Sequence, residues 1–202
     1  MKDEISSRGA DAPTGSSFIL PPSSFPRPAV FLDRDGVLNR SEVREGRPYA
    51  VTRVEDFVLL PCVAEACAQL KSAGFLLVVV TNQPDVSHGT LRLCDLEEMH
   101  RRMCAALPLD RVEVCFDAGE SDFKKPAPGM VLRAARELGI DLTRSFLVGD
   151  RWRDVDCGHA AGCATIFIDH GYAEPLRVPP DYRVSNLSEA ARVILGSTPR
   201  NP

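Results

Sequence analysis

One short stretch, Ala29 to Asn39, limits the possible folds of this chain more than any other. An apolar run over residues 29–32 leads into Asp33 and Asp35, and a glycine follows. A short apolar run next to turn-forming residues predicts a buried strand. Alternation along an extended chain would put both carboxylates on one side, with Arg34 opposite. The stretch therefore predicts two acids at the carboxyl end of a buried strand, where open α/β sheets bind ligands.

These two acids also suggest a metal. Carboxylates this close repel each other unless a proton or a cation lies between them. Hard divalent cations prefer oxygen ligands in proteins, so a site for such a cation is the first chemical inference.

The remaining sequence alternates apolar runs with helical patterns, which is typical of βαβ units. We expect a Rossmann-like, doubly wound parallel α/β sheet of about five strands, with helices on both faces. The polar stretch 37–60 predicts a small flap after the first strand, and no cap domain is expected. The predicted strands cover about residues 28–33, 75–80, 112–116, 145–148 and 163–168, and the predicted helices about 61–74, 91–107, 128–138, 152–161 and 187–195.

Length and composition favour one globular domain. The chain has 202 residues and a formal charge of -4. We expect a single domain over residues 28–196, a disordered Ser/Pro/Gly-rich arm over 1–27 and a loose tail over 197–202. The mild acidity argues against a nucleic-acid partner, which usually needs a basic patch.

The longest apolar run, Phe75 to Val80, is too short to cross a bilayer. The N-terminal residues contain no apolar run of the signal-peptide type, so we expect no secretion. The seven cysteines are odd in number and form no C-x-x-C pair. Reduced thiols packed as small hydrophobic residues are the simplest interpretation. A cytoplasmic monomer that does not bind membranes is therefore expected.

Several polar groups follow predicted strands or precede a helix, and a parallel sheet would bring them to one edge. They combine carboxylates, ammonium groups and a hydroxyl, which suits Mg²⁺ together with a phosphoryl group. An Asp can also act as a nucleophile toward phosphorus. The groups are Asp33 and Asp35, Thr81 and Asn82, Lys124 and Lys125, and Asp150 with Asp154.

Four motifs in order resemble the haloacid-dehalogenase superfamily of phosphatases. Within it, the chain is similar to the capless branch that holds D,D-heptose bisphosphate phosphatase and histidinol-phosphate phosphatase. The resemblance covers about residues 27–168. The motifs are Asp-Arg-Asp-Gly-Val-Leu-Asn at 33–39, Thr-Asn-Gln at 81–83, Lys-Lys-Pro-x-Pro-Gly-Met at 124–130 and Val-Gly-Asp-x-x-x-Asp at 148–154.

The resemblance implies a role for each acid. Asp33 would attack phosphorus and become an aspartyl phosphate. Asp35 would protonate the leaving oxygen and then activate the hydrolytic water. Asp33, the backbone carbonyl of Asp35, and Asp150 would bind Mg²⁺, with Asp154 in a supporting position.

The resemblance also implies how the other residues of the motifs bind substrate. Thr81 and the N–H of Asn82 would hold the phosphoryl oxygens, Gln83 would belong to the same substrate-binding loop, and Lys125 would stabilise the transferring group. The substrate contacts would further include Lys124 and Arg151.

Two departures from the family lie where substrate identity should be set. The relatives carry a cysteine/histidine zinc loop, but residues 115–123 contain one Cys and no His, so no zinc is expected. The usual small residues after Thr-Asn-Gln are replaced by Pro84 and Asp85, ahead of His88.

The resulting hypothesis is a Mg²⁺-dependent phosphomonoester hydrolase acting on a small phosphate ester. D-glycero-D-manno-heptose 1,7-bisphosphate or a related sugar phosphate is the best candidate, and histidinol phosphate or another small phosphate is the alternative. Three other classes stay open: a phospho-accepting signalling domain, an inactive binding module and a nucleic-acid end phosphatase.

Overall fold

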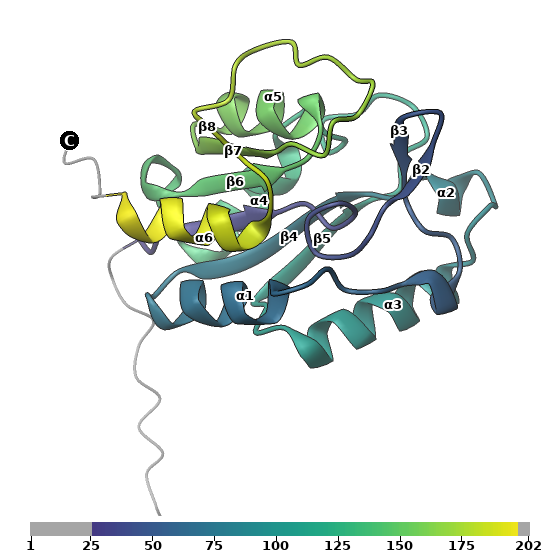
Figure 1. Ribbon diagram of the computed structural model, residues 1–202, viewed down its shortest axis with the longest axis horizontal. Helices are drawn as coiled ribbons and strands as arrows, with labels where there is room; N and C mark the ends of the chain where they lie inside the picture. The colour runs from purple at the N-terminus through teal and green to yellow at the C-terminus, as the bar shows by residue number, and fades with distance from the viewer. Residues whose placement is uncertain (1–25, 198–202) are drawn as a thin grey trace, which may run out of the picture.

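The computed structural model of the chain describes residues 26–197 (Figure 1). The predictions of an arm over residues 1–27 and a tail over 197–202 lie almost wholly outside these residues. A single domain over residues 28–196 stays a prediction.

In the described residues, six parallel strands form one sheet, with β1 near its centre. The order across the sheet is β5-β4-β1-β6-β7-β8. Parallel pairing runs through every neighbouring pair, which confirms the predicted parallel α/β class. The strands are β1 (Ala29–Leu32), β4 (Leu76–Asn82), β5 (Arg111–Cys115), β6 (Phe146–Gly149), β7 (Ala164–Ile168) and β8 (Tyr182–Val184).

The sixth strand, β8, was not expected from the sequence. It is three residues long, pairs only with β7 and carries the exposed Arg183 at its centre. So short an edge strand has too few residues to show a periodic pattern, so its pairing depends on tertiary context.

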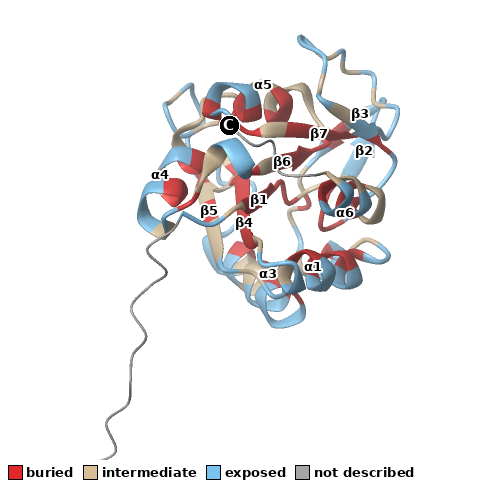
Figure 2. Cartoon of the chain, turned by 90° about the vertical axis from the view of Figure 1, so that its left-hand side faces the viewer, coloured by how far each residue is buried: buried red, intermediate tan, exposed pale blue. Residues whose placement is uncertain are grey.

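Helices cover both faces of the sheet, as the doubly wound prediction required (Figure 2). Along β1, Val30 and Leu32 face one core cluster, whereas Ala29 and Phe31 face the other. The first cluster is closed by α1 (Val63–Ser72), α3 (Leu93–Ala106) and α6 (Leu187–Gly196), and the second by α4 (Gly129–Leu138) and α5 (Trp152–Ala161).

The predicted flap is a β-hairpin. Strands β2 (Glu42–Arg44) and β3 (Arg47–Tyr49) pair antiparallel after β1. Between this hairpin and α1, the regular structure consists of one short 3₁₀ turn, Val54–Asp56. A short helix α2 (Pro84–Ser87), which the sequence did not predict, follows β4 directly.

One predicted helix start is wrong. Pro61 was expected at the first helical position, but α1 begins at Val63. Cys62 lies before it with a left-handed backbone (φ 60°), which interrupts the turn after Pro61. The predicted glycine at the end of α5 is confirmed, since Gly162 caps that helix with φ 83°.

The strand order reverses beside β1, and this reversal creates the crevice that holds the polar groups. The chain runs from β1 to β4 and β5 on one side, then continues with β6 on the other. The N–H of Asp33 donates to the carbonyl of Val148 at 2.9 Å, so the ends of β1 and β6 lie side by side. Ligands of open α/β sheets bind at such a switch point.

The prediction that the cysteines are reduced thiols packed in the core is only partly confirmed. All seven are free thiols, but Cys62, Cys94 and Cys104 are exposed rather than packed in the core. Among the described residues, no helix has the length and apolar character needed to cross a membrane.

Candidate active site

Three buried carboxylates meet at the switch point. Asp33 follows β1, Asp150 follows β6, and Asp154 lies in the first turn of α5. One oxygen from each lies within 4.8 Å of the others. The sequence placed all three at one edge of the sheet, and the structure brings them together.

A glycine makes room for this cluster. A Cβ at residue 36 would lie 1.8 Å from Oδ2 of Asp150, and Gly36 has φ +84°. No other residue fits both the space and the backbone conformation. The glycine after the two acids is therefore needed to bring Asp150 against the end of β1.

Asp150 and Asp154 differ in how their oxygens are satisfied. Oδ1 of Asp154 accepts from Lys125 at 2.6 Å, and its Oδ2 accepts from the N–H of Arg151 at 3.0 Å. Both oxygens of Asp150 are buried, and no donor in the described chain lies within ordinary hydrogen-bond distance of them, although the nearby Tyr172 hydroxyl partly offsets the effect of burial on the pKa of this carboxyl. A buried carboxylate without donors is costly unless a cation binds it. The donor set of Asp150 and Asp33 thus fits a hard divalent cation.

Lys125 joins two of the acids. Its Nζ lies 2.8 Å from Asp33 and 2.6 Å from Asp154, and the residue is almost fully buried. Burial opposes the ammonium charge, but Asp154 and Asp33 together raise the pKa of Lys125 above its ordinary value. The lysine is therefore a permanent cation beside Asp33.

The carboxyl groups themselves are hard to ionise together in the absence of a cation. Burial raises the pKa of Asp33 from 3.8 to about 6, against the opposing effect of Lys125. Burial and the nearby charges of Asp33 and Asp154 raise the pKa of Asp150 well above its usual range. A bound cation would reverse the trend by favouring the charged forms.

Asp35 behaves differently from its neighbours. Burial would raise its pKa, but Arg34, Asn39 and Gln83 donate hydrogen bonds to its carboxylate, and the net effect lowers the pKa. The sequence identified Asp35 but not the surrounding donors, because Arg34 and Asn39 contact it inside a turn without periodicity and Gln83 reaches it from the end of β4.

The Thr81–Gln83 segment is divided between the cavity and the protein interior. Thr81 and Asn82 line the cavity. Asn82 binds both the N–H and the carbonyl of Lys125 through its side chain, each at 3.0 Å. Gln83, expected to bind substrate, is fully buried and is not among the cavity-lining residues. Its Nε2 instead donates to Thr81 Oγ1 and Asp35 Oδ2, both at 2.9 Å.

A cavity of about 580 Å³ opens above these groups. Most of the residues predicted for the site line it, whereas Asp150 lies beneath its floor at 1% exposure. The lining also includes Pro84 and Asp85, where the sequence departs from the family, and the nearby His88. The predicted residues on the cavity surface are Asp33, Asp35, Thr81, Asn82, Lys124, Lys125, Arg151 and Asp154, together with Pro84, Asp85 and His88.

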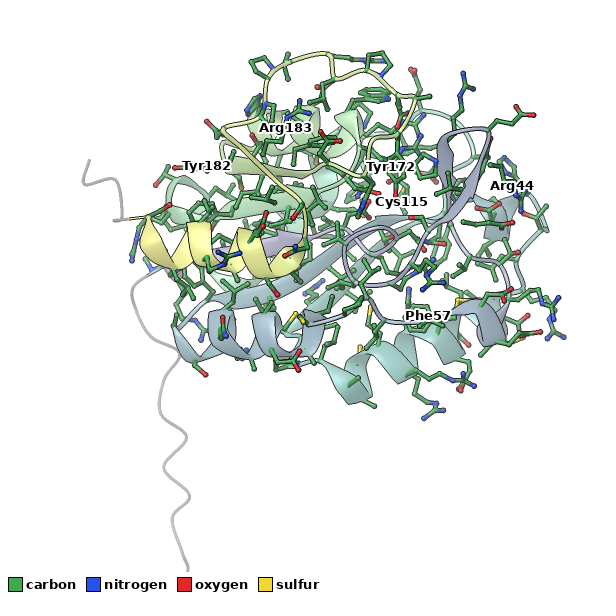
Figure 3. The ribbon with its side chains drawn as sticks, in the orientation of Figure 1. Arg44, Phe57, Cys115, Tyr172, Tyr182 and Arg183 are labelled. Atoms are coloured by element: carbon green, nitrogen blue, oxygen red, sulfur yellow. The ribbon has the colours of Figure 1, made fainter. Side chains whose placement is uncertain are left out.

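The segment between β7 and β8 forms one wall of the cavity, and sequence analysis missed it. After β7 it passes the hairpin and then arches over α5 to reach β8 (Figure 1). Its residues 173–175 line the cavity, and the N–H of Ala173 donates to the carbonyl of Gly46 at 2.8 Å. Tyr172, labelled in Figure 3, comes from the same segment. No motif marks this irregular segment.

Arg151, expected to contact substrate, is already paired. Its guanidinium donates to both carboxylate oxygens of Glu174 at 2.7 Å, and Trp152 donates to the same group at 3.0 Å. Lys124 Nζ donates to the carbonyl of Ala118 at 2.6 Å and has no ion-pair partner in residues 26–197.

Two further cations at the cavity, Arg47 and Arg153, were not identified from the sequence. Neither has a carboxylate partner within residues 26–197. Burial, followed by repulsion from Arg151, lowers the pKa of Arg153. The mouth of the cavity therefore holds cationic groups that the protein itself does not neutralise.

A family model described as HAD-hydrolase-like matches residues 123–190. The chain is 34% identical over 194 residues to the D-glycero-D-manno-heptose-1,7-bisphosphate 7-phosphatase of Thermosynechococcus vestitus, covering 84% of this chain and 96% of that protein. It is 37% identical over 150 residues to the D-glycero-beta-D-manno-heptose-1,7-bisphosphate 7-phosphatase of Rhodopseudomonas palustris, covering 67% and 80%.

A similar solved structure contains the ligands that the site suggests. The D,D-heptose 1,7-bisphosphate phosphatase of B. bronchiseptica, complexed with magnesium and phosphate, aligns with a TM-score of 0.68 and 26% identity. The alignment covers 83% of this chain and 98% of that one.

Proposed function

The chain belongs to the haloacid-dehalogenase-like hydrolases and is a phosphatase, and from this premise we propose that it hydrolyses a sugar bisphosphate with Mg²⁺ through an aspartyl phosphate. One observation carries the proposal. Among the described residues, no donor lies within ordinary hydrogen-bond distance of the two oxygens of Asp150, and one of these oxygens lies in a cluster with Asp33 at the switch point of the sheet.

The metal would be held by Asp33, Asp150 and the backbone carbonyl of Asp35. When bound, Mg²⁺ would neutralise charge on the phosphoryl oxygens as the group transfers. The solved relative from B. bronchiseptica, complexed with magnesium and phosphate, supports this choice of cation.

In the first step, Asp33 attacks phosphorus. Its Oδ1 accepts from the N–H of Arg34 at 2.7 Å and from Lys125, so the other oxygen is available to form the new bond. As the Asp33–phosphorus bond forms, the bond to the leaving oxygen breaks. The donors around Asp35 lower its pKa in the free protein, so Asp35 must take up a proton in the substrate complex; it then gives this proton to the leaving oxygen and the alcohol departs.

In the second step, water attacks the phosphorus of the aspartyl phosphate. Asp35, now a carboxylate, takes a proton from the water as the new oxygen–phosphorus bond forms. The bond to Asp33 breaks, which releases phosphate and restores both acids to their starting forms.

Thr81 and Lys125 would hold the phosphoryl group. Gln83 already donates to Thr81 Oγ1, so that oxygen acts as an acceptor there and its hydrogen remains free to reach a phosphoryl oxygen. Lys125 places its ammonium beside Asp33, where negative charge spreads over the transferring group. Asp154 orients this ammonium.

The uncompensated cations at the cavity mouth favour a substrate with a second anionic group. Because Glu174 neutralises Arg151, we assign the second group to Arg153, Arg47 and Lys124. A second phosphate is the best match. The substrate best supported is therefore D-glycero-D-manno-heptose 1,7-bisphosphate, which the names of the relatives contain.

Arg153→Ala is expected to lower kcat/KM for the bisphosphate about tenfold or more, the size of one charge-assisted contact, and to leave monophosphates nearly unaffected. The measurement is phosphate release from a panel of heptose bisphosphates, histidinol phosphate, and hexose and triose monophosphates. Arg177→Ala is the matched control, because Arg177 also stacks on Trp152 but does not line the cavity. A wild-type preference for histidinol phosphate would select the alternative substrate.

Mg²⁺ is expected to stabilise the protein more at pH about 7 than at pH about 5. The pKa of Asp33 is about 6 in the folded protein, against 3.8 for an ordinary Asp such as that of the unfolded chain. The metal-free folded protein therefore binds more protons than the unfolded chain, and its free energy of unfolding falls as the pH rises between these two values. Mg²⁺ must displace those protons, so its apparent affinity should fall as pH drops below about 6. Thermal unfolding with and without Mg²⁺ at both pH values measures this, and equal shifts would contradict it.

The absence of zinc remains a prediction. Cys115 lies among Asp117 and Ser121, whereas structural zinc sites commonly use about four Cys or His ligands. Elemental analysis of the purified protein should find no stoichiometric zinc, and one zinc per chain would overturn the prediction.

The remaining predictions concern partners and location. A small phosphate ester is the proposed partner, in line with the sugar bisphosphate in the relatives' names. A monomeric state, a cytoplasmic location and the absence of nucleic-acid and membrane partners stay predictions from the sequence.

A further inference from the structure

Arg34, which lies between the two motif acids, is fully buried, and its side chain is 0% exposed. Its carbonyl accepts from the N–H groups of residues 37, 38 and 39, so the chain turns sharply after it. A guanidinium without water needs charged or polar partners inside the protein. In residues 26–197 its side chain has two such partners, Asp35 and His100.

The contact with Asp35 is a two-pronged fork. Arg34 Nε donates to Oδ2 at 3.0 Å, and Nη2 donates to Oδ1 at 2.9 Å. Such a bidentate contact fixes the plane of a carboxylate as well as its position. Lysine, with a point-like ammonium, would keep the charge but lose this control.

Two amides complete the shell around Asp35. Asn39 donates to Oδ1 and Gln83 to Oδ2, each at 2.9 Å, and both residues are fully buried. Together with the fork, these donors use about all the lone-pair positions of a carboxylate. Asp35 can therefore exchange a proton only when one donor yields. The neutral amides bind less strongly than the guanidinium, so an amide yields and the fork holds.

His100 supports the fork from behind. Its Nε2 lies 3.4 Å from Arg34 Nη1, and the two residues are 66 positions apart. Burial and then repulsion from Arg34 lower the pKa of His100 to about 4, so the ring is neutral near pH 7. Because a guanidinium only donates, Nε2 is the acceptor and the ring proton is on Nδ1.

We propose that Arg34 is a positioning residue for proton transfer: its fork holds Asp35 in the orientation that delivers a proton to the leaving oxygen, and His100 holds Arg34. This inference rests on the proposed function, in which Asp35 is the acid and then the base. Arg34 itself does not line the cavity, so in this proposal it acts only through Asp35.

The test uses leaving groups that differ in their need for a proton. Alkyl phosphates need the acid when the P–O bond breaks, whereas p-nitrophenyl phosphate releases a stable anion without it. The quantity measured is kcat/KM with Mg²⁺, which covers the steps up to departure of the leaving group. Arg34→Lys is expected to lower it about 10²-fold for a sugar phosphate but only a few-fold for p-nitrophenyl phosphate.

His100 variants test the same idea without altering the motif. His100→Leu removes the acceptor and should show a weaker form of the same leaving-group pattern. His100→Gln keeps an acceptor at a similar distance along the side chain and should restore most of the activity. Arg101→Lys is the matched control, because Arg101 forms an exposed fork with Glu98 on the same helix and should change nothing.

Four results would overturn the inference. Arg34→Lys could keep wild-type kcat/KM, or it could lose equal factors on both ester types, as a merely structural role predicts. Thermal unfolding shows whether Arg34→Lys is folded. If it is not, a His100→Leu variant that loses kcat/KM by the same factor for the sugar phosphate and for p-nitrophenyl phosphate would overturn the inference. A wild type that hydrolyses neither ester would instead overturn the proposed function and this inference together.

Discussion

Replacing Asp33 by Asn should lower the rate of phosphate release by about 10⁵-fold or more, as expected when a covalent nucleophile is removed. The amide is nearly isosteric but cannot form the bond to phosphorus. It also removes a negative charge from a cluster in which burial already raises the pKa of Asp33 to about 6. We therefore expect the variant to fold. The measurement is single-turnover phosphate release from the preferred ester with Mg²⁺ present.

The stability of the Asp33→Asn variant is its control. Thermal unfolding without Mg²⁺ should give a midpoint at or above that of the wild type, because like-charge repulsion is reduced. A folded variant with turnover close to that of the wild type would exclude Asp33 as nucleophile.

Replacing Asp150 by Asn should lower kcat/KM by about 10³-fold, because metal-based charge stabilisation contributes several kcal/mol to such transition states. Neither oxygen of Asp150 has a donor within ordinary hydrogen-bond distance in the described residues, so a cation is the partner that the wild-type group needs. The variant should also lose the upward shift in unfolding temperature on adding Mg²⁺. Phosphate release and thermal unfolding are measured across a Mg²⁺ titration.

Asp169→Asn is the matched control for this experiment. Asp169 follows β7 as Asp150 follows β6, but it pairs with the exposed Arg183 and is not part of the cluster that Asp150 forms with Asp33 and Asp154. It should keep both activity and the response to Mg²⁺. If Asp150→Asn responds to Mg²⁺ as Asp169→Asn does, the metal is bound elsewhere.

The placement of the central acids could be predicted from the sequence for a simple physical reason. Asp33 and Asp150 each come directly after an apolar run that reads as a buried strand, and parallel strands end at one edge. Residues 117 positions apart could thus be expected to meet, and one oxygen from each now lies within the same 4.8 Å cluster.

The contacts that tune these acids could not be predicted in the same way. The fork between Arg34 and Asp35 forms within a turn, where neither helical nor strand periodicity applies. His100 lies on α3, whose apolar pattern predicts that Met99 and Met103 face the core. That pattern does not predict which side chain the His100 ring contacts.

The segment between β7 and β8, which forms one wall of the cavity, is also not revealed by sequence patterns. Glu174 lies on the irregular segment between β7 and β8, so nothing in its neighbours indicates that it would neutralise Arg151. This pairing moves the proposed second-anion contact from the family position at Arg151 to Arg153. Gln83 shows a similar shift, since a residue in a substrate-binding motif is buried behind the site.

Chemical trapping of the intermediate tests the central claim most directly. The protein is mixed with substrate and Mg²⁺, quenched within one turnover and treated with borohydride, which reduces an acyl phosphate to an alcohol. Peptide mass spectrometry then locates the modified residue. The account predicts homoserine at position 33, only when both substrate and Mg²⁺ are present. A modified residue at any other position, or rapid turnover with residue 33 unmodified throughout, would contradict it.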